Sequence, residues 1–137
     1  MSSASSRGSD DRGAFAALGL NTRDGPIMIV AAPDSVLAEA GAMKPRPSFA
    51  STLLTAEPTA RLVWWPERLH LDSQTLARLH WLIGAGGGQA WLVLDEAEEE
   101  SPSEAEFLGA LRGAGLASGP PRDVGGGERA FPVAVVG

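Results

Sequence analysis

His70 is the side chain best suited to proton transfer, because acids stand on both sides of it in the sequence. Glu67 precedes it and Asp72 follows it. Imidazole titrates near neutral pH, so a histidine oriented by a carboxylate can act as a general base. No nucleophile accompanies it in a recognisable motif, and Ser35 lacks the Gly-x-Ser-x-Gly context of a nucleophile elbow. The sequence therefore predicts no catalytic set.

A metal site is not predicted either. His70 and His80 are the only histidines, and the chain has no cysteine, whereas a zinc site takes three or four protein ligands. The acidic run from Asp95 to Glu106 lacks the alternating acids and central glycine of a calcium loop. We expect a solvated loop whose charge favours the start of the next helix.

The glycines from Gly84 to Gly88 resemble a phosphate-binding loop only in composition. A phosphate cradle runs from strand to glycines to helix, so that the helix N-terminus faces the anion. Here the glycines follow an expected helix and precede an expected strand. We therefore predict a helix C-cap and a turn.

The segment from residue 60 to residue 95 positions most of these side chains. Arg61–Trp65 is a short apolar strand in which Trp64 and Trp65 point to opposite faces, and residues 90–94 form a second strand. Between them, Asp72 or Ser73 caps a helix with one apolar face. The residues of that face are Leu76, Leu79 and Ile83. Strand, helix and strand make a right-handed crossover unit, which indicates a parallel sheet.

The N-terminal half is expected to contain further helical and strand segments. Residues 14–20 form one or two helical turns with Phe15 and Leu18 inward, and the continuous apolar run 27–31 suits a strand covered on both faces. A helix capped by Asp34 or Ser35 runs through Ala42. Residues 49–54 are expected to form a short sheet element.

Toward the C-terminus, Ser101 is the expected N-cap of a helix that ends near Arg112. The last strand covers residues 130–136, and Pro132 within it favours an edge position or a bulge. We expect antiparallel pairing here, as a hairpin around the glycines at 125–127.

The composition is that of one globular domain. The chain has 137 residues, of which 44% are hydrophobic and 20% charged, with a net charge of −6. A negative surface disfavours phosphate backbones and anionic membranes, so no nucleic-acid or membrane partner is expected. The lack of cysteine, of a signal peptide and of a membrane-spanning run leads us to expect a cytoplasmic protein. Residues 1–13 are expected to be a disordered arm, and residues 14–137 the domain.

Several short motifs occur in a familiar order. Leu18-Gly19-Leu20 precedes a strand, Pro33 follows it, and then come Leu62–Trp65, a helix, and Gly86–Val93. In this order the chain resembles the small DUF3052 proteins, relatives of the Rossmann-like methyltransferases. The resemblance implies a single small three-layer α/β domain with a mainly parallel sheet and an antiparallel C-terminal strand.

The chain departs from that family where the family binds its cofactor. Methyltransferases of this type receive the methionine part of S-adenosylmethionine (SAM) on a Gly-x-Gly-x-Gly loop after the first strand, and an acid at the end of the second strand holds the ribose. Here the loop reads Ala31 to Ser35, with no glycine before Gly41. The chain before Trp64 is too short for two intervening strand–helix units, so no ribose-binding acid is placed.

Our leading hypothesis from the sequence is a non-catalytic regulatory or protein-interaction domain that binds no cofactor. Its partner, or a second copy of itself, would use an apolar surface formed by Pro45, Pro47 and Trp65. One alternative is a subunit of a larger assembly.

The rival hypothesis is an enzyme, either a divergent SAM-dependent methyltransferase or another enzyme that binds a small molecule. Its ligand would lie where the strands end at their carboxyl side, as in open α/β sheets. The residues predicted to bind it are Ala32, Pro33, Asp34, Trp65, Glu67 and Asp95.

Overall fold

The structure is a computed structural model that describes residues 15, 18–67, 70–95, 99, 101–125 and 128–136. The arm expected over residues 1–13 and part of the acidic run, residues 96–98 and 100, lie outside the described residues. Within them, no helix has the length and apolar character needed to cross a membrane.

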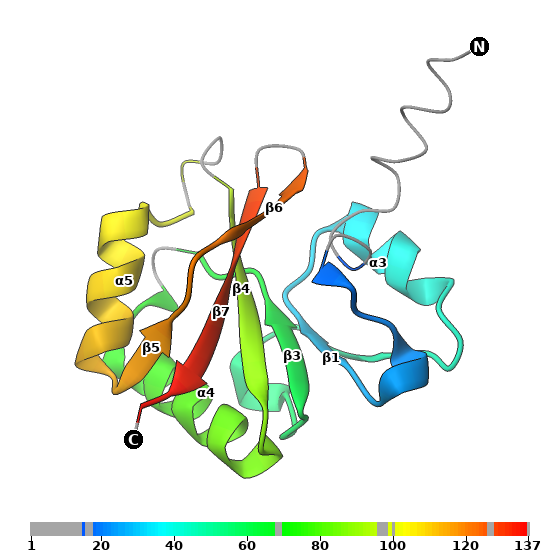
Figure 1. Ribbon diagram of the computed structural model, residues 1–137, viewed down its shortest axis with the longest axis horizontal. Coiled ribbons are helices and arrows are strands. Elements are labelled where there is room, and N and C mark those ends of the chain that lie inside the picture. The colour runs from blue at the N-terminus through cyan, green and yellow to red at the C-terminus, as the bar shows by residue number, and fades with distance from the viewer. Residues whose placement is uncertain are drawn as a thin grey trace.

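One mixed sheet organises the described chain, with strand order β2-β1-β3-β4-β7-β5 and with β6 paired to β7 (Figure 1). The strands are β1 (Met28–Val30), β2 (Ser48–Ala50), β3 (Arg61–Trp64), β4 (Gln89–Asp95), β5 (Leu116–Ser118), β6 (Arg122–Gly125) and β7 (Glu128–Val135). β2, β1, β3 and β4 are mutually parallel, while β7 runs antiparallel to β4, β5 and β6. The predicted sheet, mainly parallel with antiparallel pairing at the C-terminus, is confirmed.

Helices cover both faces of the sheet. They are α3 (Asp34–Gly41), α4 (Ser73–Gly86) and α5 (Glu104–Gly113), with short 3-10 turns η1 (Thr22–Asp24) and η2 (Leu53–Thr55). Figure 1 shows α4 and α5 together at one side of the strands and α3 apart from them. The three-layer α/β class expected from the sequence is therefore correct.

Alternation along the strands divides the core into two clusters. Leu62 and Trp64 of β3 join the buried leucines of α4 and α5, whereas Val63 and Trp65 join Val36 and Ala40 of α3 together with Phe15 and Leu18. Successive side chains of a strand point to opposite faces, which is why the continuous apolar runs in β1, β3 and β4 are buried on both sides. The opposite orientation predicted for the two tryptophans is confirmed, as is the inward position of Phe15 and Leu18.

The glycine run ends α4 and starts β4, as predicted. Asp72 caps the helix by accepting a hydrogen bond from the Thr75 N–H at 2.8 Å. At the other end Gly87 takes a left-handed conformation, with φ at 68°, and its N–H donates to the carbonyl of Ile83. Glycine adopts this conformation without steric cost, so Gly87 is the C-cap residue.

Two predicted helix starts are wrong by one or two residues. α5 is capped by Ser103, not Ser101, because Ser103 and Glu106 form a complete capping box. Ser101 instead accepts a hydrogen bond from the Asp95 N–H at 3.1 Å. The N-cap of α3 is Pro33, which provides no side-chain hydrogen bond, rather than Asp34 or Ser35.

The edge position or bulge predicted at Pro132 is also wrong, since β7 has neighbours on both sides and its pairing with β4 runs unbroken through Pro132. The Pro132 carbonyl accepts from the Gly119 N–H at 2.9 Å. In an antiparallel strand the nitrogen of a residue faces the same side as its carbonyl. That side is occupied by residues 119–121, which connect β5 to β6, so the missing N–H removes no bond from the β4 ladder.

Candidate functional site

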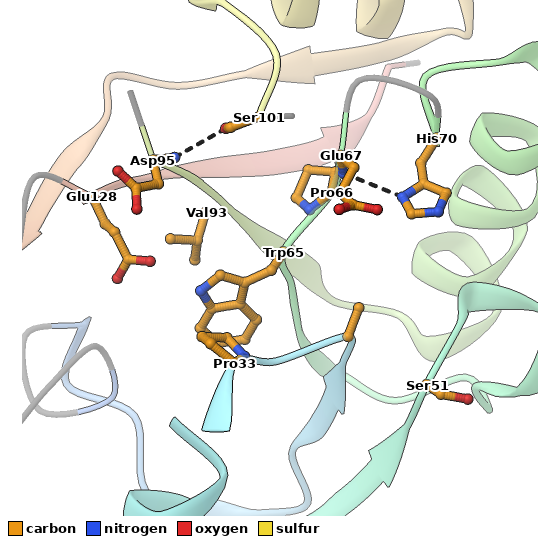
Figure 2. A pocket seen from close by; sticks show the side chains of 11 residues that line it. Pro33, Ser51, Trp65, Pro66, Glu67, His70, Val93, Asp95, Ser101 and Glu128 are labelled. Atoms are coloured by element: carbon orange, nitrogen blue, oxygen red, sulfur yellow. Dashed lines mark hydrogen bonds between the residues drawn. The ribbon is translucent and has the colours of Figure 1, made fainter. Parts of the chain in front are cut away.

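A cavity of about 420 Å³ opens at the carboxyl ends of the parallel strands. Residues from the ends of β1, β2, β3 and β4, the start of β7 and two loops line it (Figure 2). From β1 the chain crosses to β2 on one side and then returns to β3 on the other. This reversal of strand order is where open α/β sheets bind their ligands. The volume lies within the range of small-molecule sites, about 300–1,000 Å³.

Ala31 shapes the cavity at the end of β1 through an uncommon backbone conformation. Its φ is 56°, and no other described residue except glycine has a positive φ. Its N–H donates to the Ala50 carbonyl at 2.9 Å, and the Trp65 N–H donates to the adjacent Val30 carbonyl at 3.3 Å. A left-handed alanine costs about 1–2 kcal/mol. The chain therefore adopts, without glycine, a backbone conformation that glycine normally supplies.

We expect Ala31→Gly to raise the free energy of unfolding by up to about 1 kcal/mol, because relief of the left-handed strain exceeds the added entropy of the unfolded chain. Urea denaturation measures the change. Ala32→Gly is the matched control, since Ala32 has no positive φ, and it should destabilise by about 0.4–1 kcal/mol. Equal decreases in the free energy of unfolding for the two variants would show that the backbone of Ala31 is not strained.

Trp65 is the central aromatic wall of the cavity. Its side chain is 9% exposed and meets Phe15 edge-on, with ring centroids 6.3 Å apart. The indole nitrogen Nε1 is buried, and its N–H makes no hydrogen bond of ordinary geometry with the described residues. In Figure 2 this nitrogen points toward the side of the cavity that holds Glu128. A buried indole N–H normally has an acceptor, and the carboxylate of Glu128 is the group that faces it.

Two carboxylates stand together on that side. Asp95 of β4 and Glu128 of β7 are register partners, and both line the cavity. Burial raises the pKa of Glu128 above its usual value, and the charge of Asp95 raises it further, while the facing indole N–H of Trp65 partly opposes both effects. A carboxyl group whose pKa is raised by burial and by a like charge in a cleft is typical of functional sites. Glu128 was not among the residues predicted from the sequence.

His70 and Glu67 lie on the other side of Trp65 (Figure 2). The Glu67 backbone N–H donates to Nδ1 of His70 at 3.2 Å, so the histidine is oriented by a backbone amide. Its ring lies 6.3 Å from that of Trp64. His80 is on α4, outside the cavity lining. Within the part of the chain described, no group of three or more His, Asp or Glu side chains is arranged to hold a metal ion.

The structure brings together four of the six residues predicted to bind a ligand. Pro33, Trp65, Glu67 and Asp95 line the cavity, as does Ala31, the neighbour of the predicted Ala32. Ala32 and Asp34 are not among the lining residues. Whether the four contact a ligand remains a prediction.

The proposed interaction surface is less accessible than the sequence suggested. Pro45 is exposed, but Pro47 and Trp65 are buried. Two of its three residues therefore offer little surface in this structure, and partner binding through them stays a prediction.

Solved methyltransferases share this fold. The mitomycin 7-O-methyltransferase MmcR is similar with a TM-score of 0.64 and 11% identity, over 93% of this chain and 53% of that protein. Magnesium protoporphyrin IX methyltransferase (ChlM) from Synechocystis, solved with bound SAM, gives a TM-score of 0.52 and 13% identity, over 85% and 62%. The O-methyltransferase NcsB1 from neocarzinostatin biosynthesis was solved with S-adenosyl-L-homocysteine (SAH) and 1,4-dihydroxy-2-naphthoic acid. It gives a TM-score of 0.58 and 15% identity, over 81% of this chain and 49% of that protein.

This is the Rossmann-like fold of SAM-dependent methyltransferases. At such low identity the similarity shows the fold alone. The chain spans between 49% and 62% of the length of these three enzymes. No protein-family model matches the sequence, and no curated protein matches it, so the resemblance to DUF3052 proteins stays a prediction.

Proposed function

We propose that this chain is a divergent SAM-dependent methyltransferase domain that binds its cofactor in the cavity at the carboxyl ends of β1, β3 and β4. The cavity at the reversal of strand order is the observation that carries the proposal. Solved proteins of the same fold contain SAM or SAH. We prefer this proposal to the non-catalytic hypothesis, because a cavity is present at the end of β1 although the loop there contains no glycine.

The residues present fit a nucleoside cofactor in three respects. Ala31 already holds the loop after β1 in a left-handed conformation. Ser51, directly after β2, lines the cavity where the family carries a ribose-binding acid, so its hydroxyl would replace that acid. The carboxylates of the lining suit the cationic sulfonium and ammonium groups of SAM. When bound, SAM would supply an electrophilic methyl group. The residues of this chain would bind and orient the cofactor and exclude water from it.

Calorimetric titration with SAM and SAH tests the proposal, with a Kd in the micromolar range expected. Ser51→Trp should weaken binding at least about tenfold, because Ser51 lines the cavity and an indole there would occupy part of its volume. Ser35→Trp is the matched control: Ser35 is exposed on α3 and is not a lining residue, so affinity should be retained. Absence of heat at millimolar ligand, or equal affinity in both variants, would overturn the proposal.

A second candidate is the interaction domain favoured by the sequence, and one surface supports it. Leu54 of η2 and Trp81 of α4 are 74% and 49% exposed. Arg78 links them: its guanidinium lies 4.5 Å from the Trp81 ring centroid and donates to the carbonyls of Leu53, Leu54 and Ala56. Contiguous apolar patches, rather than single exposed side chains, are typical of partner surfaces, so this candidate requires Leu54 and Trp81 to act together. Mass measurement in solution and pull-down would show a dimer or partner that Trp81→Ser abolishes.

A further inference from the structure

His70 is held in the wall of the cavity by two hydrogen bonds to Glu67. The His70 backbone N–H donates to the Glu67 carbonyl at 2.8 Å, and the Glu67 backbone N–H donates to Nδ1 of the His70 ring at 3.2 Å. The ring also lies beside that of the buried Trp64, with centroids 6.3 Å apart. The backbone and the core therefore set the position of this ring before any ligand binds.

These contacts define which ring nitrogen carries the proton. A backbone amide can only donate a hydrogen bond, so Nδ1 offers its lone pair to the Glu67 N–H and carries no hydrogen itself. A neutral imidazole has one N–H, which is then on Nε2. Figure 2 shows Nε2 on the part of the ring that is turned away from this bond.

The general-base role considered for His70 from the sequence does not fit this arrangement. A base at Nε2 needs a lone pair there, whereas in the neutral ring that nitrogen holds the proton and Glu67 uses the lone pair of Nδ1. The Asp72 carboxylate does not orient the ring, because it caps α4 and accepts from the N–H and the hydroxyl of Thr75 at 2.8 and 3.0 Å. His70 therefore presents a hydrogen-bond donor at Nε2 rather than an acceptor.

The lining of the cavity contains few other donors. Among the described residues, no lysine or arginine lines it. The Trp65 N–H faces the Glu128 carboxylate. The His70 ring has only the one hydrogen bond at Nδ1 within the described chain. Apart from serine hydroxyls, the Nε2–H of His70 is thus the side-chain donor that this lining offers to a ligand.

We infer that His70 selects the second ligand of this cavity: its Nε2–H donates to a neutral oxygen acceptor, and the ligand is a small molecule that carries a carbonyl group. An ammonium group has no lone pair for this donor. A carboxylate is disfavoured by the three acids of the lining, which are Glu67, Asp95 and Glu128. The inference rests on the proposed function in one respect, since this ligand would there be the methyl acceptor.

Long-range 1H–15N NMR of the full chain measures the position of the proton. At alkaline pH, where an imidazole is neutral, the His70 proton should be on Nε2 in the protein without ligand. His80 is the only other histidine, so the His80→Gln variant assigns the signals of His70. A His70 ring with its proton on Nδ1 would overturn the inference.

Ligand-observed NMR titration with acetophenone and α-methylstyrene tests the ligand class, because the second compound has the same shape with CH2 in place of the carbonyl oxygen. Acetophenone should bind at least about fivefold more tightly. His70→Gln keeps an N–H donor near the position of Nε2 and should retain this affinity, whereas His70→Met has a similar length without a donor and should lose at least about fivefold. Both variants lose the imidazole ring, so the difference between them reports the donor rather than the packing. His80→Met is the control, since His80 lies on α4 outside the lining, and affinity should be unchanged.

A parallel titration with SAH separates this inference from the cofactor proposal. Acetophenone binding that His70→Gln keeps and His70→Met loses, with no SAH binding, supports the donor role and contradicts the methyltransferase assignment. SAH binding without acetophenone binding, or with equal acetophenone affinity in His70→Gln and His70→Met, overturns the donor role and leaves the cofactor proposal standing. Equal affinity for acetophenone and α-methylstyrene would show that the carbonyl oxygen is not recognised, and would also overturn it.

Discussion

Gly88→Ala is expected to lower the free energy of unfolding by about 3 kcal/mol or more, a large share of the stability of a domain this size. A Cβ at Gly88 would lie 1.9 Å from the backbone oxygen of Ala60. The obstacle is backbone rather than a flexible side chain, so relief requires moving the start of β3 away from β4. Those two strands are paired at this point, since the Gln89 N–H donates to the same Ala60 carbonyl at 3.2 Å.

Gly84→Ala is the matched control for that substitution. Gly84 lies on the exposed side of α4, and a Cβ there meets nothing within 4 Å. Because alanine favours helix over glycine, Gly84→Ala should stabilise the protein by up to about 1 kcal/mol. Urea denaturation of both variants measures the contrast. A loss of less than about 1 kcal/mol in Gly88→Ala would show that the strands tolerate the extra atom.

The fold was predictable because its signals are local and agree with one another. The apolar runs of β1, β3 and β4, the Asp72 cap and the glycine stop of α4 all indicate a parallel sheet with crossover helices. The two misplaced helix caps are local errors of one or two residues, whereas the error at Pro132 occurred where the answer depends on partners distant in sequence. Pro132 is tolerated inside the sheet only because residues 119–121 leave the ladder on the side its nitrogen faces, and a sequence pattern cannot show this.

The site was predictable only in part, for a similar reason. Pro33, Trp65, Glu67 and Asp95 follow strand ends, and the carboxyl ends of parallel strands meet at one edge. Glu128 and Ser51 reach the same cavity through strand pairings whose register was not evident from composition. Ala31 gave no signal, because its function is a backbone angle that alanine rarely adopts.

Trp64→Ala is expected to cost about 3–5 kcal/mol of folding free energy, which approaches the whole stability of a small domain. Trp64 is 2% exposed and packs in the cluster shared by α4, α5 and the sheet. Its removal leaves a hole that the surrounding strands cannot close, since β3 is paired on both sides.

The same substitution at Trp81 isolates the effect of burial. Trp81 is 49% exposed on α4, and its contact with Arg78 is a cation–π interaction worth about 0.5–1 kcal/mol at an exposed site. Trp81→Ala should therefore cost no more than about 1 kcal/mol. Thermal and urea unfolding of the two variants give the comparison, and similar losses would contradict the assignment of Trp64 to the core. Because the Trp64 ring also lies beside His70, a folded Trp64→Phe variant should report on the cavity. We expect its His70 ring signals to shift in NMR spectra more than those of His80, which lies beside Gly115.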